Sequence, residues 1–379
     1  MDKVFKYELF NKMIRDFAVN EVKPLAHEVD EQERFPYETV EKMAKLGLMG
    51  IIVPKEYGGM GGDYKMYIKA VEELSKVCAT TGVILSAHTS LCIAPIMEYG
   101  NEEQKKKYLP KLASGEWLGA FGLTEPNAGT DANNQTTTAV KEGDHWVLNG
   151  SKIFITNAGP ANVYFVIAVT GRNPKGVECA AFIVEKGFPG FSVGKKELKM
   201  GIRGSSTCEL IFENCIVPEA NLVGKIGEGV KMALKTLDGG RVGISAQALG
   251  IAEGALEATV AYVKERKQFN KPISAFQNTQ FCLADLYTKI NAASLLVERA
   301  TEAKQNKSPM LGMYAAQAKL FAAETAMEAT TKCVQLHGGY GYTREYPVER
   351  MMRDAKITEI YEGTSEVQRM VISGALLKK

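Results

Sequence analysis

Hydrophobic and polar positions follow two different periods along this chain, and the change of period divides it into three parts. Residues 1–118 have a helical pattern, in Glu-, Lys- and Met-rich segments broken by turn signals such as the glycines at 58–62. Residues 119–224 consist of short β-rich runs separated by Gly-Asp, Asn-Gly and Pro-Gly pairs. Residues 225–379 return to the helical period. The pattern predicts helices, then a β domain, then a helical bundle.

The middle part is expected to form a small, mostly antiparallel β domain. Its predicted strands lie at residues 135–140, 145–148, 163–169, 179–184 and 207–212. The last part has three stretches long enough for bundle helices, at 230–266, 276–306 and 309–337. One face of the second stretch carries Leu283, Leu286, Ile290, Ala293, Leu296 and Ala300. The predicted fold is therefore mainly α with a middle β domain.

Charge and composition exclude several classes of function. The 46 basic and 44 acidic residues leave a net charge of +2, which favours neither nucleic acid nor an anionic membrane as a partner. The seven cysteines are widely spaced without a C-x-x-C pair, which indicates reduced thiols and no metal site. The longest uninterrupted apolar run, 163–169, is far shorter than the ~18 residues of a membrane span, and the N-terminus lacks the features of a signal peptide. We expect a soluble, cytoplasmic protein.

Common nucleotide and hydrolase motifs are missing. No G-x-G-x-x-G follows a predicted strand, and no G-x-x-x-x-G-K-[ST] occurs, so the sequence supports neither a Rossmann nor a P-loop site. Gly204-Ser205-Ser206 is not a nucleophile elbow, and the chain has only four histidines, so a serine hydrolase is disfavoured.

Two segments of the predicted β domain could surround a planar ligand. Residues 121–131 combine glycines with hydroxyl and carboxylate side chains, and such a loop can offer N–H and O–H donors to a ring edge or a phosphate. Residues 149–157 place Phe154 beside Thr156 at a strand end, where a ring could be stacked and hydrogen-bonded. Taken alone, an ordinary polar loop and a hairpin with a core phenylalanine explain these segments as well.

Three segments of the helical part could bind an anionic ligand. Asp238-Gly-Gly-Arg241 puts two glycines early in a long helix, where each costs ~1 kcal/mol relative to alanine unless something approaches the backbone closely. Arg266 ends that helix and could bind phosphate. Residues 335–342 break a helix with consecutive glycines whose N–H groups could face an anion. Tight helix packing, a surface arginine and a plain helix C-cap are the alternatives.

The segment Ile360-Tyr-Glu-Gly-Thr-Ser-Glu366 contains the candidate for acid–base chemistry. Glu362 lies between an aromatic residue and a glycine, an apolar setting that would tune a carboxylate to act as a base. The alternative is that Glu362 and Glu366 are only first-turn helix charges.

Taken together and in this order, these segments resemble the acyl-CoA dehydrogenase flavoproteins, most closely the short-chain butyryl-CoA dehydrogenases of anaerobic bacteria. The resemblance covers residues 1–379, and the strings at 149–156, 335–339 and 360–366 are specific to that family. It implies an N-terminal helical domain (1–118), a middle β domain (119–224) and a C-terminal four-helix bundle (225–379). It also implies a homotetramer, a dimer of dimers, with FAD at the subunit interfaces.

The resemblance assigns roles residue by residue. Positions around the flavin ring are Phe121, Leu123, Thr124, Gly129, Thr130, Phe154, Ile155 and Thr156. Other FAD positions, some of them reaching across from a neighbouring subunit, are Arg266, Phe269, Gln277, Gln335, Leu336, His337, Gly338, Gly339, Thr364 and Glu366. Positions that contact the acyl-CoA are Thr130, Asp238, Arg241 and Gly363. Glu362 matches the catalytic base that removes the α proton, while the β hydrogen leaves as hydride to the flavin.

Departures from the family pattern limit what can be transferred. Some relatives carry the base just before the arginine of the Asp238–Arg241 segment, but here that position is Gly240, so Glu362 has no rival. Thr130 replaces a common Ser and Phe154 a common Trp, which preserves the hydroxyl and the aromatic face. Asn270 stands where glycine is usual, which affects the expected pyrophosphate loop. Residues 91–97 lie in the region that shapes the acyl pocket of relatives.

The resemblance implies an FAD enzyme that interconverts butyryl-CoA and crotonyl-CoA and exchanges electrons with an electron-transferring flavoprotein. In a fermenting cell the same enzyme would run as an enoyl-CoA reductase. The alternatives are a reductase for acrylyl-, branched or aryl-acrylyl-CoA, an acyl-CoA oxidase, or a catalytically silent relative with a structural role.

Overall fold

The structure is a computed structural model that describes residues 3–173 and 176–377. The N-terminal helices are α1 (Lys3–Phe17), α2 (Ala26–Glu31), α3 (Tyr37–Lys45), α4 (Tyr64–Val77), α5 (Ala79–Ser86), α6 (Ala94–Tyr99) and α7 (Glu102–Ser114). The strands are β1 (Gly119–Gly122), β2 (Thr138–Glu142), β3 (His145–Ile155), β4 (Val163–Asn173), β5 (Gly176–Glu185), β6 (Phe191–Lys196), β7 (Cys208–Pro218) and β8 (Leu222–Val223). The C-terminal helices are α8 (Gly229–Glu265), α9 (Gln277–Gln305), α10 (Leu311–His337), α11 (Gly339–Tyr342), α12 (Val348–Thr358) and α13 (Ser365–Leu377). A short hairpin, β9 (Lys267–Gln268) and β10 (Lys271–Pro272), joins α8 to α9.

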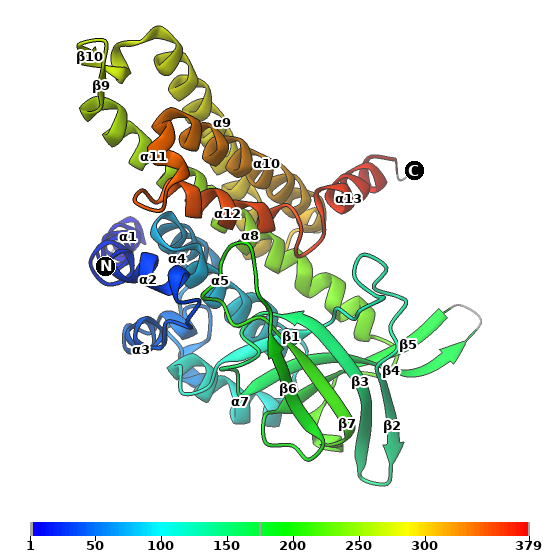
Figure 1. Cartoon of the computed structure of the whole chain (residues 1–379). Helices are drawn as coiled ribbons and strands as arrows, with labels where there is room; N and C mark the ends of the chain where they lie inside the picture. Colours follow the sequence, from blue (N-terminus) through cyan, green and yellow to red (C-terminus); the bar gives the residue numbers. More distant parts are fainter. Residues whose placement is uncertain (1–2, 174–175, 378–379) are drawn as a thin grey trace.

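These elements confirm the predicted fold class. Figure 1 shows the N-terminal helices packed against the C-terminal bundle. The β domain lies at the bottom of this view, away from the end of the bundle that carries β9 and β10. The three long bundle helices begin and end within two residues of their predicted bounds. The division at residues 118 and 224 falls between the helical and β elements and stays our proposal.

Local sequence signals explain where several helices begin. The Asn101 side chain accepts a hydrogen bond from the backbone N–H of Gln104 (2.8 Å), and the Gln104 side chain accepts one from the Asn101 N–H (3.0 Å). This capping box starts α7, which ends at Gly115 in a left-handed conformation. Asp63 caps α4 by accepting from the N–H of Met66.

The sheet has the strand order β6-β7-β3-β2-β4-β5-β8, with β1 beside β4. Most pairs are antiparallel, as predicted, while β1 and β2 each pair with β4 in parallel. The prediction was incomplete, because it contained no strand at β1, β6 or β8. These strands have two to six residues and are identified by pairing with distant neighbours, which a local pattern does not show.

Helix α8 lies at the centre of the molecule and packs against α4, α9, α10 and α12. Glycines allow α4 to approach it closely. A Cβ atom on Gly254 would lie 2.1 Å from the carbonyl oxygen of Lys76, and one on Gly250 would lie 2.3 Å from that of Glu72. The helix propensity that these glycines cost α8 is offset by the contact they permit.

The helical stretch Ala79–Tyr99 is long and apolar enough to cross a membrane by composition, but 94% of its most apolar window is buried inside the protein. It consists of α5, a π-helical segment at Ala87–Ile93 and α6. The stretch has no long uninterrupted apolar run, because Thr, Ser and His residues interrupt it, so the sequence did not suggest it as a membrane span. Burial of this kind is typical of a core helix in a soluble protein.

We predict that Gly254→Ala separates α4 from α8 and lowers the stability of the protein by ~1–3 kcal/mol, because the added methyl group collides with backbone atoms. Differential scanning calorimetry of the holoprotein measures this as a lower Tm. The control is Gly374→Ala in α13, where no atom lies within 4 Å of the added Cβ. It should leave Tm unchanged or slightly raised, and equal Tm values for the two variants would contradict the packing argument.

Candidate active site

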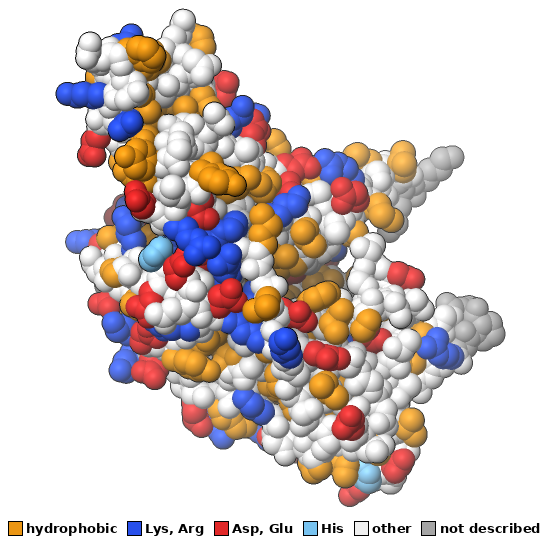
Figure 2. All heavy atoms as spheres, viewed as in Figure 1, with side chains coloured by type: hydrophobic (Ala, Val, Ile, Leu, Met, Phe, Trp, Pro, Cys, Tyr) orange, Lys and Arg blue, Asp and Glu red, His pale blue; other side chains and the backbone are white. Residues whose placement is uncertain are grey.

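A cavity of about 660 Å³ lies where the β domain meets α5, α8 and the turn before α13. The space-filling view shows apolar side chains around a hollow between the β domain and the C-terminal helices (Figure 2). Twelve of the predicted site residues line this cavity: Phe121, Leu123, Thr124, Gly129, Thr130, Phe154, Ile155, Thr156, Arg241, Glu362, Gly363 and Thr364. Segments more than 200 residues apart in sequence therefore share one site.

Glu362 is the titratable group with the most unusual environment in this cavity. The residue as a whole is half-buried, but its Oε2 atom is buried and has no hydrogen-bond partner among the described residues. Burial raises the pKa of the Glu362 carboxyl to about 8, although the positive charges of Arg241 and Lys319 oppose the rise. A carboxylate that water and donors do not stabilise is a strong base, which suits proton abstraction.

The backbone at Glu362 and Gly363 is left-handed, with φ of 54° and 97°. Such a conformation is costly for a non-glycine residue and needs support from its surroundings. Three donors supply it. Arg241 Nε donates to the carbonyl of Glu362 (3.2 Å), and Lys319 Nζ and Gln368 Nε2 each donate to the carbonyl of Gly363 (2.7 Å).

Gly240 provides the space for the Glu362 carboxyl group. A Cβ atom on Gly240 would lie 2.1 Å from Glu362 Oε2 and 2.8 Å from Leu91 Cδ2. A side chain at position 240 and the glutamate at 362 would therefore occupy the same volume. This contact explains why position 240, the alternative position of the base in the family pattern, is a glycine here.

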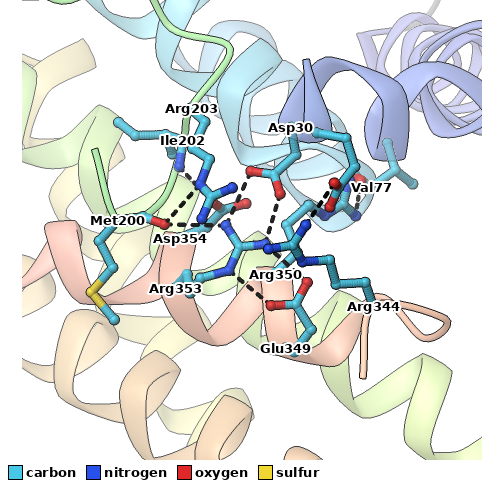
Figure 3. A network of polar contacts seen from close by, with 11 residues as sticks. Asp30, Val77, Met200, Ile202, Arg203, Arg344, Glu349, Arg350, Arg353 and Asp354 are labelled. Carbon is cyan, nitrogen blue, oxygen red and sulfur yellow. Dashed lines mark hydrogen bonds and ion pairs between the residues drawn. The ribbon is translucent and has the colours of Figure 1, made fainter. Parts of the chain in front are cut away.

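Polar contacts with two other parts of the chain fix α12, which leads directly into the Glu362 turn (Figure 3). Arg353 donates to Asp30 Oδ2 of α2 (2.7 Å) and to the carbonyl of Met200 (3.1 Å). Asp354, one residue further, accepts a bond from the N–H of Ile202 (2.5 Å). The bonds to Asp30 and from Ile202 are half-buried or buried, and together with the exposed bond to Met200 they hold α12 against both the N-terminal helices and the β-domain loop.

A β-bulge places Phe154 on the cavity wall. The pairing of β3 with β7 shifts register between Lys152 and Ile155, and Phe154 lies inside this shift with φ of 58°. A bulge redirects a side chain out of the regular alternation. The Phe154 ring is 60% exposed, next to Thr156, which is the arrangement a planar ring needs for stacking and an edge hydrogen bond.

A buried ion pair stiffens the neighbouring loop at 121–137. Lys152 Nζ donates to Glu125 Oε1 (2.7 Å), Gln135 Oε1 (2.9 Å) and the carbonyl of Leu123 (3.2 Å). Glu125 also accepts bonds from the backbone N–H and hydroxyl of Thr136. Its pKa falls to about 2 because, although burial opposes the fall, Lys152 and these donors stabilise the carboxylate. The loop residues Leu123 and Thr124 are thereby fixed at the cavity.

Asp238 and Arg241 lie together, as their spacing on one helix predicts. Arg241 Nη1 donates to Asp238 Oδ1 (2.9 Å), and the arginine is 6% exposed. Burial raises the pKa of Asp238, while Arg241 and Lys304 oppose that rise. Arg241 lines the cavity with Glu362, whereas Asp238 contacts it only through the arginine.

Other predicted FAD residues do not line this cavity. Arg266, Phe269 and Gln277 lie around the β9–β10 hairpin at the far end of the bundle, where Phe269 is 88% exposed (Figure 1). Residues 335–339 end α10, and Gly338 has φ of 61°. Glu366 is exposed in the first turn of α13. One chain thus carries two separate groups of predicted FAD residues, which is the geometry expected if they serve cofactors of different subunits.

The prediction from the sequence left out part of the cavity wall. The missed residues include Val83, Ala87, Leu234, Leu237, Ile360 and Val367, together with Glu197, Lys199 and Met200 of the loop before β7. It also missed Lys319 and Gln368, which hold the Glu362 turn. A signal existed for Lys319, because it shares a helix face with Ala315, Ala322 and Ala326, and a lysine on a buried apolar face needs a partner.

The raised pKa of Glu362 predicts a stability effect with a defined sign. Since the folded-state pKa lies near 8 and the ordinary value near 4.5, stability is greatest below pH ~4.5 and falls as the pH rises towards 8. Glu362→Gln removes this titration. We expect the variant to become more stable than the native holoprotein as the pH rises from 5 to 8, by ~2–4 kcal/mol in the free energy of unfolding at pH 8. The measurement is the difference in Tm between the two proteins across this pH range.

The control for this titration is Glu142→Gln, which removes an exposed carboxylate from β2. Its Tm difference from the native protein should stay constant over the same pH range. A constant difference for Glu362→Gln as well would show that the carboxyl group titrates normally.

Comparisons with known proteins identify the family. The family models "Acyl-CoA dehydrogenase, N-terminal domain", "middle domain" and "C-terminal domain" match residues 6–116, 120–215 and 227–377. A short-chain specific acyl-CoA dehydrogenase of Clostridium acetobutylicum is 62% identical over 98% of both chains.

Two solved structures have the same fold over nearly the whole chain. The butyryl-CoA dehydrogenase of Megasphaera elsdenii has a TM-score of 0.95 at 51% identity, and the match covers 98% of each chain. A chain from a structure described as the electron transferring flavoprotein of Acidaminococcus fermentans, from work on flavin-based electron bifurcation, has a TM-score of 0.95 at 54% identity, again over 98% of each chain.

The chain therefore belongs to the acyl-CoA dehydrogenase family of flavin-dependent oxidoreductases, whose cofactor is FAD. The cavity fits this cofactor. Its wall combines the exposed aromatic side chain of Phe154 with the hydroxyl-bearing residues Thr124, Thr130 and Thr156, as a planar ring with polar edges requires. FAD supplies the hydride acceptor when it is bound there.

Proposed function

We propose that this protein is a short-chain acyl-CoA dehydrogenase that interconverts butyryl-CoA and crotonyl-CoA, with Glu362 as the base. The carrying observation is the buried Glu362 carboxylate, held in a left-handed turn on the wall of the cavity that fits the flavin. The names and high identities of the relatives support the short-chain substrate. In a fermenting cell the reaction would run towards butyryl-CoA.

The base must meet an acidified proton, and the chain supplies part of the polarising site. In the described chain the backbone N–H of Glu362 donates to no acceptor, although its neighbours Tyr361 and Ser365 both donate within the turn. A thioester carbonyl placed at this N–H would be polarised, which stabilises negative charge as the α proton leaves. Glu362 accepts that proton in a pocket with a largely apolar lining, from which a bound substrate and cofactor would displace water.

Arg241 and Asp238 are proposed to position the thioester end of the substrate. Arg241 forms hydrogen bonds to both Asp238 and the Glu362 carbonyl, so the substrate-binding segment and the base move as one unit. Thr130 and Gly363 are the remaining substrate positions that we propose, and both line the cavity.

The wall behind the base leaves little room for a long acyl chain. Ala87 and Leu91 line the cavity on the π-helical segment, and behind them Tyr67 is fully buried with its hydroxyl group directed at Ser86. Tyr361 also lines the cavity, and its hydroxyl group donates to Gln247, which is fully buried. A closely packed interior does not admit extra methylene groups without strain. This favours an acyl chain of about the length of butyryl.

We further propose that the enzyme is a homotetramer, a dimer of dimers, and exchanges electrons with an electron-transferring flavoprotein in the cytoplasm. The tetramer would unite the two groups of FAD residues, with Arg266, Phe269, Gln277 and residues 335–339 of one subunit completing a neighbour's site. The match to a structure described as an electron transferring flavoprotein supports that partner. All seven cysteines are free, which is consistent with a reducing compartment.

Replacement of the base separates chemistry from cofactor binding. We predict that Glu362→Gln purifies as a yellow protein with FAD bound but shows at least a 1,000-fold slower bleaching of the flavin by butyryl-CoA under anaerobic conditions, since glutamine cannot accept the proton. Stopped-flow absorbance measures the bleaching. A normal rate would remove Glu362 from this role, and a colourless native protein would instead indicate a silent structural relative.

A panel of substrates tests the proposed chain length. We predict that butyryl-CoA bleaches the flavin faster than propionyl-, isobutyryl-, 3-phenylpropionyl- or octanoyl-CoA, because the closed wall behind Ala87 and Leu91 sets the fit. The rates are compared at saturating substrate without oxygen. If a branched or aryl substrate bleaches the flavin fastest, it takes the place of butyryl-CoA as the proposed substrate. Rapid peroxide production in air would indicate an oxidase.

A further inference from the structure

Lys319 is a fully buried lysine at the middle of α10, on the face that also contains Ala315, Ala322 and Ala326. Its one hydrogen bond among the described residues goes from Nζ to the carbonyl of Gly363 (2.7 Å), and no described carboxylate lies within 4 Å of it. A buried ammonium without an ion-pair partner is costly, so native proteins retain one where its charge is used.

The neighbouring charges do not compensate Lys319. On α8, Arg241 is already paired with Asp238, and its positive charge acts on the base together with that of Lys319. The other charged or titratable groups around the site come from every element packed on it: Tyr67, Glu197, Lys199, Lys304, Arg353, Lys356, Glu359, Tyr361 and Glu366. The carboxylate of Glu362 and the ammonium of Lys319 remain as the two opposite, buried and unpaired charges on either side of one peptide turn.

We propose that Lys319 is a positioning residue for the base: it fixes the Gly363 carbonyl, and with it the left-handed turn, and it adds to Arg241 a second positive charge that stabilises the ionised Glu362. This inference deepens the proposed function and depends on Glu362 being the base. Although burial lowers the pKa of Lys319 to about 8, Glu362 opposes that fall, so the lysine keeps its proton at neutral pH.

The two parts of this role can be separated, because Gln368 fixes the same carbonyl without a charge. Gln368 Nε2 donates to Gly363 at 2.7 Å, the same distance as Lys319 Nζ, and its side chain is fully buried too. Removing Gln368 therefore weakens the turn and leaves the electrostatics intact. Removing Lys319 weakens the turn and also removes the positive charge.

The test compares the pH dependence of kcat/KM for flavin bleaching by butyryl-CoA in the FAD-loaded tetramer. Lys319→Met and Lys319→Gln should shift the midpoint of the rising limb upward by ~1 unit or more, because loss of the positive charge raises the pKa of the base. At pH 7 their rates should fall at least tenfold. Lys319→Arg should restore the native midpoint, and Gln368→Met should slow the reaction without moving the midpoint.

A matched control removes another largely buried lysine that is remote from the cavity. Lys76 belongs to α4, and its side chain pairs with Glu253 of α8 at 2.8 Å. Lys76→Met should lower Tm without shifting the pH midpoint. If the Lys319→Met midpoint also stays at the native value, Lys319 is only structural and the inference is wrong. If Lys319→Met does not fold, Lys319→Gln gives the same comparison, since it keeps a donor and loses the charge.

A second readout does not depend on turnover. In a double-mutant cycle of Lys319→Gln and Glu362→Gln, the Tm changes should be non-additive near pH 8, where Glu362 is ionised and Lys319 protonated in part of the molecules, and additive at pH 6, where Glu362 is protonated. Additive changes at both pH values overturn the coupling. Failure of the native enzyme to bleach with any acyl-CoA, together with non-additive Tm changes, would overturn the proposed function while leaving the charge pair established.

Discussion

The burial of one carboxylate, that of Glu362, governs the arrangement of this site. An ionised group without a donor on Oε2 is unfavourable in an apolar cavity, and it is held there by a turn whose backbone is itself strained. The C-terminal bundle therefore contributes more than packing. Helix α8 provides the space at Gly240, α10 and α13 provide donors to the turn, and α12 is fixed to the rest of the chain.

Much of the fold could be predicted from the sequence because its longest elements repeat their pattern many times. Helices α8, α9 and α10 each run for 27 residues or more, so their periodicity is clear and their predicted ends differ little from the observed ones. Strand β1 shows the opposite case. Its sequence Gly-Ala-Phe-Gly is buried throughout and has no alternation, and it becomes a strand only through parallel pairing with β4.

The candidate site could be predicted where chemistry and local sequence coincide, as at Glu362, whose role was recognised from the family string around it and not from its charge. Gln368, which acts through a backbone carbonyl, gave no such signal. Gln368 is one polar residue among several in α13, and its importance follows from a bond to a carbonyl five residues earlier. The position of α12 depends on the bond between Arg353 and Asp30, which are more than 300 residues apart in sequence. A single sequence does not reveal such a partner.

The contact between Gly240 and Glu362 also restricts how such an enzyme could change over evolutionary time. Because a Cβ atom at 240 would lie 2.1 Å from Glu362 Oε2, any side chain at 240 would displace the Glu362 carboxyl group from the position it has here. A carboxylate on α8 and one in the turn before α13 are therefore not independent of each other, since each depends on where the other side chain lies. Moving the base from one position to the other would thus require coordinated changes at both, which favours keeping the position a chain already uses.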